Sequence, residues 1–179
     1  MIKISLDLGC GKEPKNPFEA DKVFGVDFKE NLDQNIKASD LAIGPIPYEG
    51  DTFDFVSAFD FIEHIPRVIY APEKRFSFVE LMDEIYRVLK PGGHFLSFTP
   101  AFPAIDAFSD PTHVNVITEK TFPIYFCNEV VARIYGFKGE FQLIGQKWHD
   151  WTSWPIAIGA GVENPGQTHL LTILKKPEP

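Results

Sequence analysis

The fold is most constrained by a recurrence of short apolar segments along the first hundred residues of this 179-residue chain. Residues 2–8 alternate apolar and polar side chains before a glycine-rich turn, and residues 22–27 (KVFGVD) end in an acid. Residues 52–59 and 93–99 are rich in the β-branched and aromatic residues that favour strands. We therefore predict four strands in this part of the chain.

A helix is predicted between the last two of these strands, over residues 76–89. Its apolar side chains recur at the three- and four-residue spacing of one helix face: Val79, Met82, Ile85, Tyr86 and Leu89. Residues 90–93 (KPGG) end it, because proline cannot continue the hydrogen-bond ladder and glycine tolerates a reversed backbone. A second helix is predicted over residues 118–135, with Thr118 as its N-cap and Pro123 near the first turn.

Strands that alternate with crossovers favour an α/β fold with a mostly parallel sheet covered on both faces. Residues 141–147 and 169–174 also read as strands, and the Gly/Pro-rich loop between them predicts an antiparallel pair. Two prolines, Pro14 and Pro17, predict an irregular first crossover in place of a long helix. No break in composition divides the chain, so we expect a single domain over residues 1–179.

Composition argues against several classes of function. The net charge of −8, without a lysine or arginine stripe, disfavours nucleic acid as a partner. The two cysteines lie far apart and form no metal-ligand motif, and they are expected to be small buried hydrophobes. The N-terminus does not resemble a signal peptide, and no apolar run is long enough to span a bilayer. We expect a cytoplasmic protein without a membrane partner.

The candidate site is where the parallel strands end, because open α/β sheets bind ligands beyond the carboxyl ends of their strands. Five segments are predicted to meet there: residues 7–11 (DLGCG), Asp27, residues 39–41, residues 59–61 and residues 99–100. The glycines permit close approach of a ligand to the backbone, and Asp27 could accept hydrogen bonds from two ribose hydroxyls. A plain turn and a solvated carboxylate remain the alternatives.

The motifs LDLGCG, GVD, DTFDFVSAFDFIEHI and ELMDEIYRVLKPGGHFLSFTP occur in this order over about residues 4–100. Together they resemble the class I S-adenosylmethionine-dependent methyltransferases, of the type that acts on small molecules. The resemblance implies a Rossmann-like fold, S-adenosylmethionine as cofactor, no metal, and methyl transfer to a small-molecule acceptor. One departure is Glu13, which stands where the family often has a third glycine before a full helix.

The resemblance also implies a set of cofactor-binding residues. The methionyl and ribose part would lie along the glycine turn, the ribose hydroxyls on the acid that ends the second strand, and the adenine on the pair at residues 40–41. The amino group would lie at the end of the strand over residues 52–59, with a histidine covering the cofactor. The residues are Asp7, Gly9, Cys10, Gly11, Asp27, Asp40, Leu41, Phe59, Asp60 and His64.

Histidines are the candidate acid–base groups for the acceptor, since imidazole exchanges protons near neutral pH. His113, in a loop beyond residues 93–99, is the first candidate for a catalytic base. His149, followed by Asp150, is the second. Either could instead be structural, as we expect of His94 and His169. Three tryptophans between the last two strands could form an acceptor lid or cover the sheet edge: Trp148, Trp151 and Trp154.

Two other functions remain open at this stage. One is a catalytically silent module that binds the cofactor or a partner, which would share the same motifs. In either case the chain could act as a monomer or a homodimer. An NAD-dependent oxidoreductase also uses a glycine turn and a ribose acid. That enzyme class expects phosphates at a helix N-terminus after the turn, which Pro14 and Pro17 disfavour.

Overall fold

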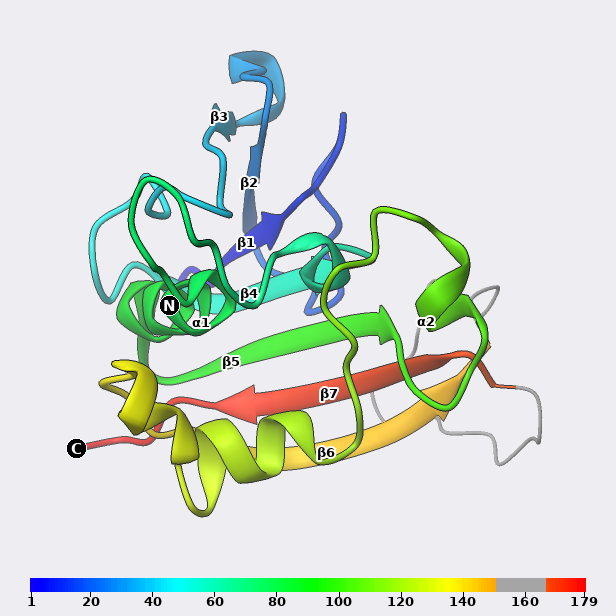
Figure 1. The fold of residues 1–179 in the computed structure, drawn as a ribbon. Helices are drawn as coiled ribbons and strands as arrows, with labels where there is room; N and C mark the ends of the chain where they lie inside the picture. Colours follow the sequence, from blue (N-terminus) through cyan, green and yellow to red (C-terminus); the bar gives the residue numbers. More distant parts are fainter. Residues whose placement is uncertain (151–166) are drawn as a thin grey trace.

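The computed structural model describes residues 1–150 and 167–179, which form one seven-stranded sheet (Figure 1). The strand order is β3-β2-β1-β4-β5-β7-β6. The strands are β1 (Ile4–Leu8), β2 (Lys22–Asp27), β3 (Ile36–Ala38), β4 (Phe53–Phe59), β5 (Leu89–Pro100), β6 (Gln142–His149) and β7 (His169–Lys175). The predicted strands are present with ends shifted by a few residues, and β5 begins earliest relative to expectation because the KPGG residues belong to it.

The first five strands are parallel, while β7 runs antiparallel to both β5 and β6. The expected mostly parallel sheet with an antiparallel C-terminal pair is thus confirmed. Sequence order reverses beside β1, because the chain builds outward to β3 and then returns to place β4 on the other side of β1. The carboxyl ends of β1 and β4 therefore flank the switch point at which ligands bind in such sheets.

The helical segments are few and short: η1 (Leu32–Gln34), η2 (Ile62–His64), α1 (Ser77–Val88), α2 (Asp106–Ser109), η3 (Pro123–Cys127) and η4 (Val131–Tyr135). The predicted helix before KPGG is confirmed as α1, which ends at Val88. Its apolar face packs on the main hydrophobic core through Leu81, Met82 and Ile85, all buried. Among the residues that the structure describes, no helix has the length and apolar character needed to cross a membrane.

The single helix predicted over residues 118–135 is wrong. A π-helical turn, η3, and a 3-10 turn, η4, take its place, and Val130 between them has a left-handed backbone with φ of 46°. The carbonyl of Phe126 accepts a hydrogen bond from the Phe141 amide at 2.8 Å, where a continuous helix would use the amide of residue 130. A tertiary contact thus overrides the local helical pattern.

The first crossover, as predicted, contains no regular helix. It instead lies against the sheet face opposite α1, where the ring of Phe18 stacks on Phe55 of β4 with centroids 4.4 Å apart. On the same face, Phe59 and Phe98 form a small buried cluster with Leu96 and Leu171. This segment therefore covers its part of the sheet face by aromatic packing, without a helix.

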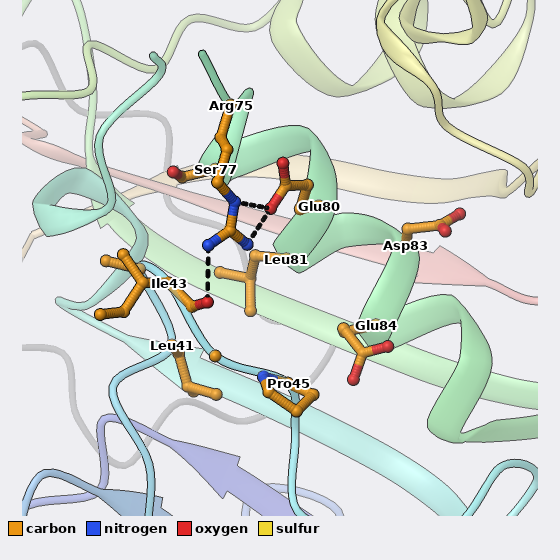
Figure 2. Close-up of a pocket in the computed structure, with 11 residues that line it drawn as sticks. Leu41, Ile43, Pro45, Arg75, Ser77, Glu80, Leu81, Asp83 and Glu84 are labelled. Atoms are coloured by element: carbon orange, nitrogen blue, oxygen red, sulfur yellow. Dashed lines mark hydrogen bonds and ion pairs between the residues drawn. The ribbon is translucent and has the colours of Figure 1, made fainter. Parts of the chain in front are cut away.

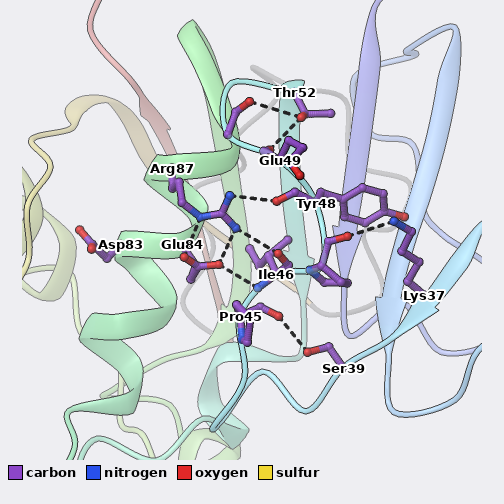
Figure 3. Close-up of polar contacts among 12 residues, drawn as sticks. Lys37, Ser39, Pro45, Ile46, Tyr48, Glu49, Thr52, Asp83, Glu84 and Arg87 are labelled. Carbon is purple, nitrogen blue, oxygen red and sulfur yellow. Dashed lines mark hydrogen bonds and ion pairs between the residues drawn. The ribbon is translucent and has the colours of Figure 1, made fainter.

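The connection between β3 and β4 is also irregular, and two arginines attach it to the α1 region. Arg75 donates to the Ile43 carbonyl at 2.7 Å and pairs with Glu80, beside a cavity of about 250 Å³ (Figure 2). Arg87 donates to the carbonyls of Ile46 and Tyr48 at 3.0 and 2.9 Å (Figure 3). These side chains satisfy backbone groups that a crossover helix would satisfy internally.

Replacing Arg87 should therefore loosen this connection. We expect Arg87→Met to lower the free energy of unfolding by about 1–3 kcal/mol, because two carbonyls lose their donor while the aliphatic stem is kept. Arg133→Met, which removes only an exposed ion pair with Glu140, should change it by less than about 1 kcal/mol. Urea unfolding of both variants measures this. Equal effects would contradict the role assigned to Arg87.

Candidate functional site

The glycine turn after β1 and the acid at the end of β2 meet in space. The amide of Gly11 donates to Oδ2 of Asp27 at 2.8 Å, and the amide of Phe28 donates to Oδ1 at 2.7 Å. Gly9 also ties the turn to β2 by donating to the Val26 carbonyl at 2.9 Å. The two elements that were predicted to share a ligand are thus adjacent, and Asp27 remains partly exposed.

Both glycines of the turn have the left-handed backbone that favours glycine, with φ of 64° at Gly9 and 66° at Gly11. Their surroundings differ. A Cβ on Gly9 would meet the ring of Phe61 at 2.2 Å, whereas a Cβ on Gly11 would meet nothing within 4 Å. Gly9 is therefore closed over by the chain, while the exposed side of Gly11 leaves space for a ligand beside the Asp27 carboxylate.

Asp7, at the start of the motif, lies beneath the turn with no exposed surface. Its Oδ2 accepts from the Lys15 amide at 2.9 Å, and its Oδ1 accepts from the Ser57 hydroxyl at 2.7 Å. Burial raises the pKa of Asp7 to about 6, although these hydrogen bonds partly oppose that rise. Both carboxylate oxygens are engaged by the protein, so Asp7 orders residues 9–15.

Cys10 is buried against β2, where Gly25 has no side chain. A Cβ at Gly25 would lie 2.5 Å from the Cys10 sulfur and 2.9 Å from Pro14. Burial raises the pKa of the Cys10 thiol to about 12, and that of Cys127 to about 11. Both cysteines are buried and apolar in character, as expected, and neither is a thiolate at neutral pH.

The residues after β3 form a tight turn. Asp40 is exposed, and its Oδ1 accepts from the Ala42 amide at 3.0 Å, while Leu41 is buried. The exposed Asp40 carboxylate keeps free acceptor positions, because one hydrogen bond uses only one of its lone pairs.

The end of β4 carries a strained residue. Asp60 has a φ of 47°, its amide donates to the Phe98 carbonyl at 2.9 Å, and its Oδ1 lies 2.9 Å from Nε2 of His169. The sequence interpretation treated His169 as structural and missed this contact. The predicted antiparallel pairing could have indicated this contact, because it places His169, the first residue of β7, at the edge of the sheet where β4 and β5 end.

Directly after Asp60, the η2 turn brings Glu63 and His64 together with His113. Each offers one potential ligand atom, and these atoms all lie within 4.8 Å of one another. The His64 and His113 rings are 4.9 Å apart, edge to face. Glu63 is only 1% exposed, and burial raises its pKa to about 8 despite a hydrogen bond from the Thr99 hydroxyl.

His149, the second candidate base, lies outside this cluster. It ends β6 opposite His169, it is buried, and burial lowers its pKa. Trp148 packs on the main core from the other face of β6. The remaining candidates for an acceptor lid, Trp151 and Trp154, lie outside the described residues.

A second cavity, of about 400 Å³, lies on the α1 side of the sheet. Aromatic and apolar side chains such as Phe76, Phe126 and Tyr135 line much of it. Asn115 lines it as well, and its backbone N–H donates to the Glu63 carbonyl at 2.9 Å. The cavity is therefore next to the loop that carries the histidine cluster, but neither described cavity includes the glycine turn.

A seven-stranded sheet of this order, with a glycine turn beside a strand-end acid, has the architecture of class I methyltransferases. A family model described as a methyltransferase domain matches residues 3–123, more than half of the chain. The chain therefore belongs to the methyltransferase domain family. S-Adenosylmethionine is the cofactor of this class, as the motifs predicted.

Solved structures share the fold at low identity. A SAM-dependent methyltransferase from Archaeoglobus fulgidus is 18% identical, with a TM-score of 0.59 over 98% of this chain and 86% of that chain. One from Mesorhizobium loti is 17% identical, with a TM-score of 0.58 over 98% and 91%. A complex of a Haloferax volcanii methyltransferase with the Trm112 activator gives 17% identity and 0.62 over 99% and 83%. No curated protein matches the chain.

The raised pKa of Asp7 makes stability depend on pH in a specific direction. A carboxyl whose pKa rises from 3.8 in the unfolded chain to about 6 in the folded protein favours folding below pH 4, and this advantage is lost as the pH rises through 6. We expect the Asp7→Asn variant not to lose stability in this way as the pH rises, because asparagine does not ionise. The difference in unfolding free energy between the two proteins should thus shift by up to about 3 kcal/mol between pH 4 and 7.

Asp54→Asn is the matched control. Burial alone would raise the pKa of Asp54, but hydrogen bonds from Lys90, Lys3 and the Ile4 amide lower it to about 2. Its stabilising effect is nearly complete at pH 4, so the difference from wild type should change by less than about 0.5 kcal/mol between pH 4 and 7. Denaturant unfolding at several pH values measures both variants. A constant difference for Asp7→Asn would rule out the buried, pKa-shifted carboxylate.

Proposed function

We propose that this chain transfers a methyl group from S-adenosylmethionine to a small-molecule acceptor held beside His64 and His113. The observation that carries the proposal is the partly exposed carboxylate of Asp27, fixed beside the open side of Gly11. When bound, S-adenosylmethionine supplies a methyl group on a positively charged sulfur, which is already activated for displacement. The protein then has to orient the acceptor and handle its proton.

Asp27 can hold two ribose hydroxyls without losing its internal contacts. Each of its oxygens accepts one backbone amide, and each carboxylate oxygen has a further lone pair. In our proposal, Asp40 and Leu41 lie along the adenine, and Asp60 with Phe59 lies near the amino group. Asp7 and Cys10 support the turn from below.

The acceptor half of the site is linked to the cofactor half by Phe61. Its ring lies over Gly9, and the η2 turn that begins after it carries His64 toward His113. We propose that the acceptor is held at this histidine pair and that His113 contacts its nucleophilic atom. A small acceptor also suits a chain of net charge −8, which disfavours polyanionic substrates.

The architecture of the turn favours this function over dinucleotide-dependent oxidation. No described residue between Gly9 and Asp21 lies in a helix, so no helix N-terminus is available there for a pyrophosphate. S-Adenosylmethionine carries no phosphate and does not need one. A silent binding module would bind the cofactor equally, and only transfer of a labelled methyl group separates it from an enzyme.

Calorimetric titration with S-adenosylmethionine tests the cofactor assignment. We expect wild type to bind, and Asp27→Ala to bind at least tenfold more weakly, because hydrogen bonds to a charged group contribute about 1.5–3 kcal/mol. Asp33→Ala, which removes an exposed acid on η1, should bind like wild type. Circular dichroism confirms that each variant is folded. Unchanged binding by Asp27→Ala, or binding of NAD in place of S-adenosylmethionine, would overturn the proposal.

A further inference from the structure

Glu63, His64 and His113 form a cluster of potential metal ligands, and the methyl-transfer proposal does not explain why these three groups are together. Two of its members are adjacent on the η2 turn, and the third comes from the loop after β5, 49 positions further along the chain. Their ligand atoms nevertheless lie within 4.8 Å of one another. Folding therefore brings together two imidazoles and one carboxylate at the carboxyl edge of β4 and β5.

Only one of the two oxygens of the Glu63 carboxyl group has a hydrogen-bond partner among the described residues. Its Oε2 accepts from the Thr99 hydroxyl at 2.8 Å, but Oε1 is buried and has no hydrogen-bond partner within residues 1–150 and 167–179. The residue is 99% buried, with 1% of its surface exposed. Leaving a buried acceptor unpaired has a free-energy cost, because the group has lost its hydrogen bonds to water. A positively charged occupant would remove that cost.

The hydrogen bonds around His64 determine which of its nitrogens is free. The Thr112 hydroxyl donates to Oδ1 of Asp110 at 2.6 Å, so it accepts from Nδ1 of His64 at 3.0 Å. The proton therefore lies on Nδ1, and Nε2 keeps its lone pair. A backbone or side-chain oxygen on one ring nitrogen, with the other nitrogen free, is the arrangement that orients histidine ligands in metal sites.

His113 contributes a second unpartnered nitrogen. Its Nδ1 is buried and lacks a hydrogen-bond partner among the described residues. The residue is otherwise partly exposed, as is His64. Both rings thus have room to adjust, whereas Glu63 is fixed by its surroundings.

We propose that Glu63, His64 and His113 bind a divalent transition-metal ion of the Zn²⁺ type. Two imidazoles and one carboxylate form a donor set that suits zinc and its neighbours, and three protein ligands leave a coordination position open. Bonds of 2.0–2.1 Å in a tetrahedral site separate ligand atoms by about 3.4 Å. The ligand atoms now lie within 4.8 Å of one another, so the two partly exposed rings would have to rotate to bring them to that separation. Mg²⁺, which prefers oxygen ligands, suits the cluster poorly.

The role of such an ion rests on the proposed function. An open coordination position next to the cofactor half of the site would hold an oxygen of the acceptor and lower the pKa of that hydroxyl. His113 would then be a metal ligand, and the proton released from the acceptor hydroxyl would pass to solvent water. Binding of the ion, by contrast, rests on the cluster alone and is tested without cofactor.

The test titrates chelator-treated, full-length protein with ZnCl₂ by calorimetry and with CoCl₂ by visible absorption. We expect one ion per chain and tetrahedral Co²⁺ bands, with no response to MgCl₂. His113→Ala should weaken Zn²⁺ binding at least tenfold and remove the Co²⁺ bands. His94→Gln is the control, since this histidine lies within β5 on the face that carries Phe55, and it should bind like wild type.

Glu63→Gln tests the carboxylate by the same measurements, with at least a tenfold loss expected. If this buried variant does not fold, the partly exposed His113 decides the question. Absence of saturable one-to-one binding, or unchanged binding by His113→Ala, overturns the metal site. S-Adenosylmethionine titrations run in parallel separate the two proposals, because failure of wild type to bind the cofactor refutes methyl transfer and leaves the metal result standing.

Discussion

A buried carboxylate controls the geometry of the whole cofactor side. Asp7 has no exposed surface, and its oxygens are occupied by the Lys15 amide and the Ser57 hydroxyl. A buried charge without such partners would be strongly unfavourable, so residues 9–15 have to fold back over the end of β1. The same fold-back places Cys10 and Pro14 over the bare backbone of Gly25. The turn is thus positioned from below by the core, without help from a following helix.

Much of the fold could be predicted because it follows from local pattern. β-Rich segments, the 3.6-residue periodicity of α1 and the helix-ending KPGG run each act over a few residues. The prediction failed where a distant partner decides the structure. The Phe141 amide donates to the Phe126 carbonyl and so interrupts the helix predicted over residues 118–135. No helix or strand was predicted for the β3–β4 connection, which depends on Arg75 and Arg87. Their hydrogen bonds to loop carbonyls leave no periodic signal in the sequence.

Some contacts in the candidate site could be predicted from the sequence, and others could not. The glycine turn and Asp27 were predictable, because parallel neighbouring strands place their carboxyl ends together. The approach of His64 to His113 follows from the same rule applied to β4 and β5. The contact between Asp60 and His169 depends on the register of β7. The burial of Glu63 depends on how the η2 turn packs, and neither property has a sequence pattern of its own.

Asp60 explains why the two halves are separate yet adjacent. A left-handed backbone at a non-glycine residue costs about 1 kcal/mol, and here the Phe98 carbonyl and His169 hold it in place. The reversal turns the chain out of β4, so that the ring of Phe61 covers Gly9 and the next turn directs Glu63 into the protein. An extended residue at this position would continue the strand direction and carry Glu63 and His64 away from the loop after β5. Local strain at one residue is therefore what places a polar, histidine-bearing site beside a turn built almost entirely from backbone.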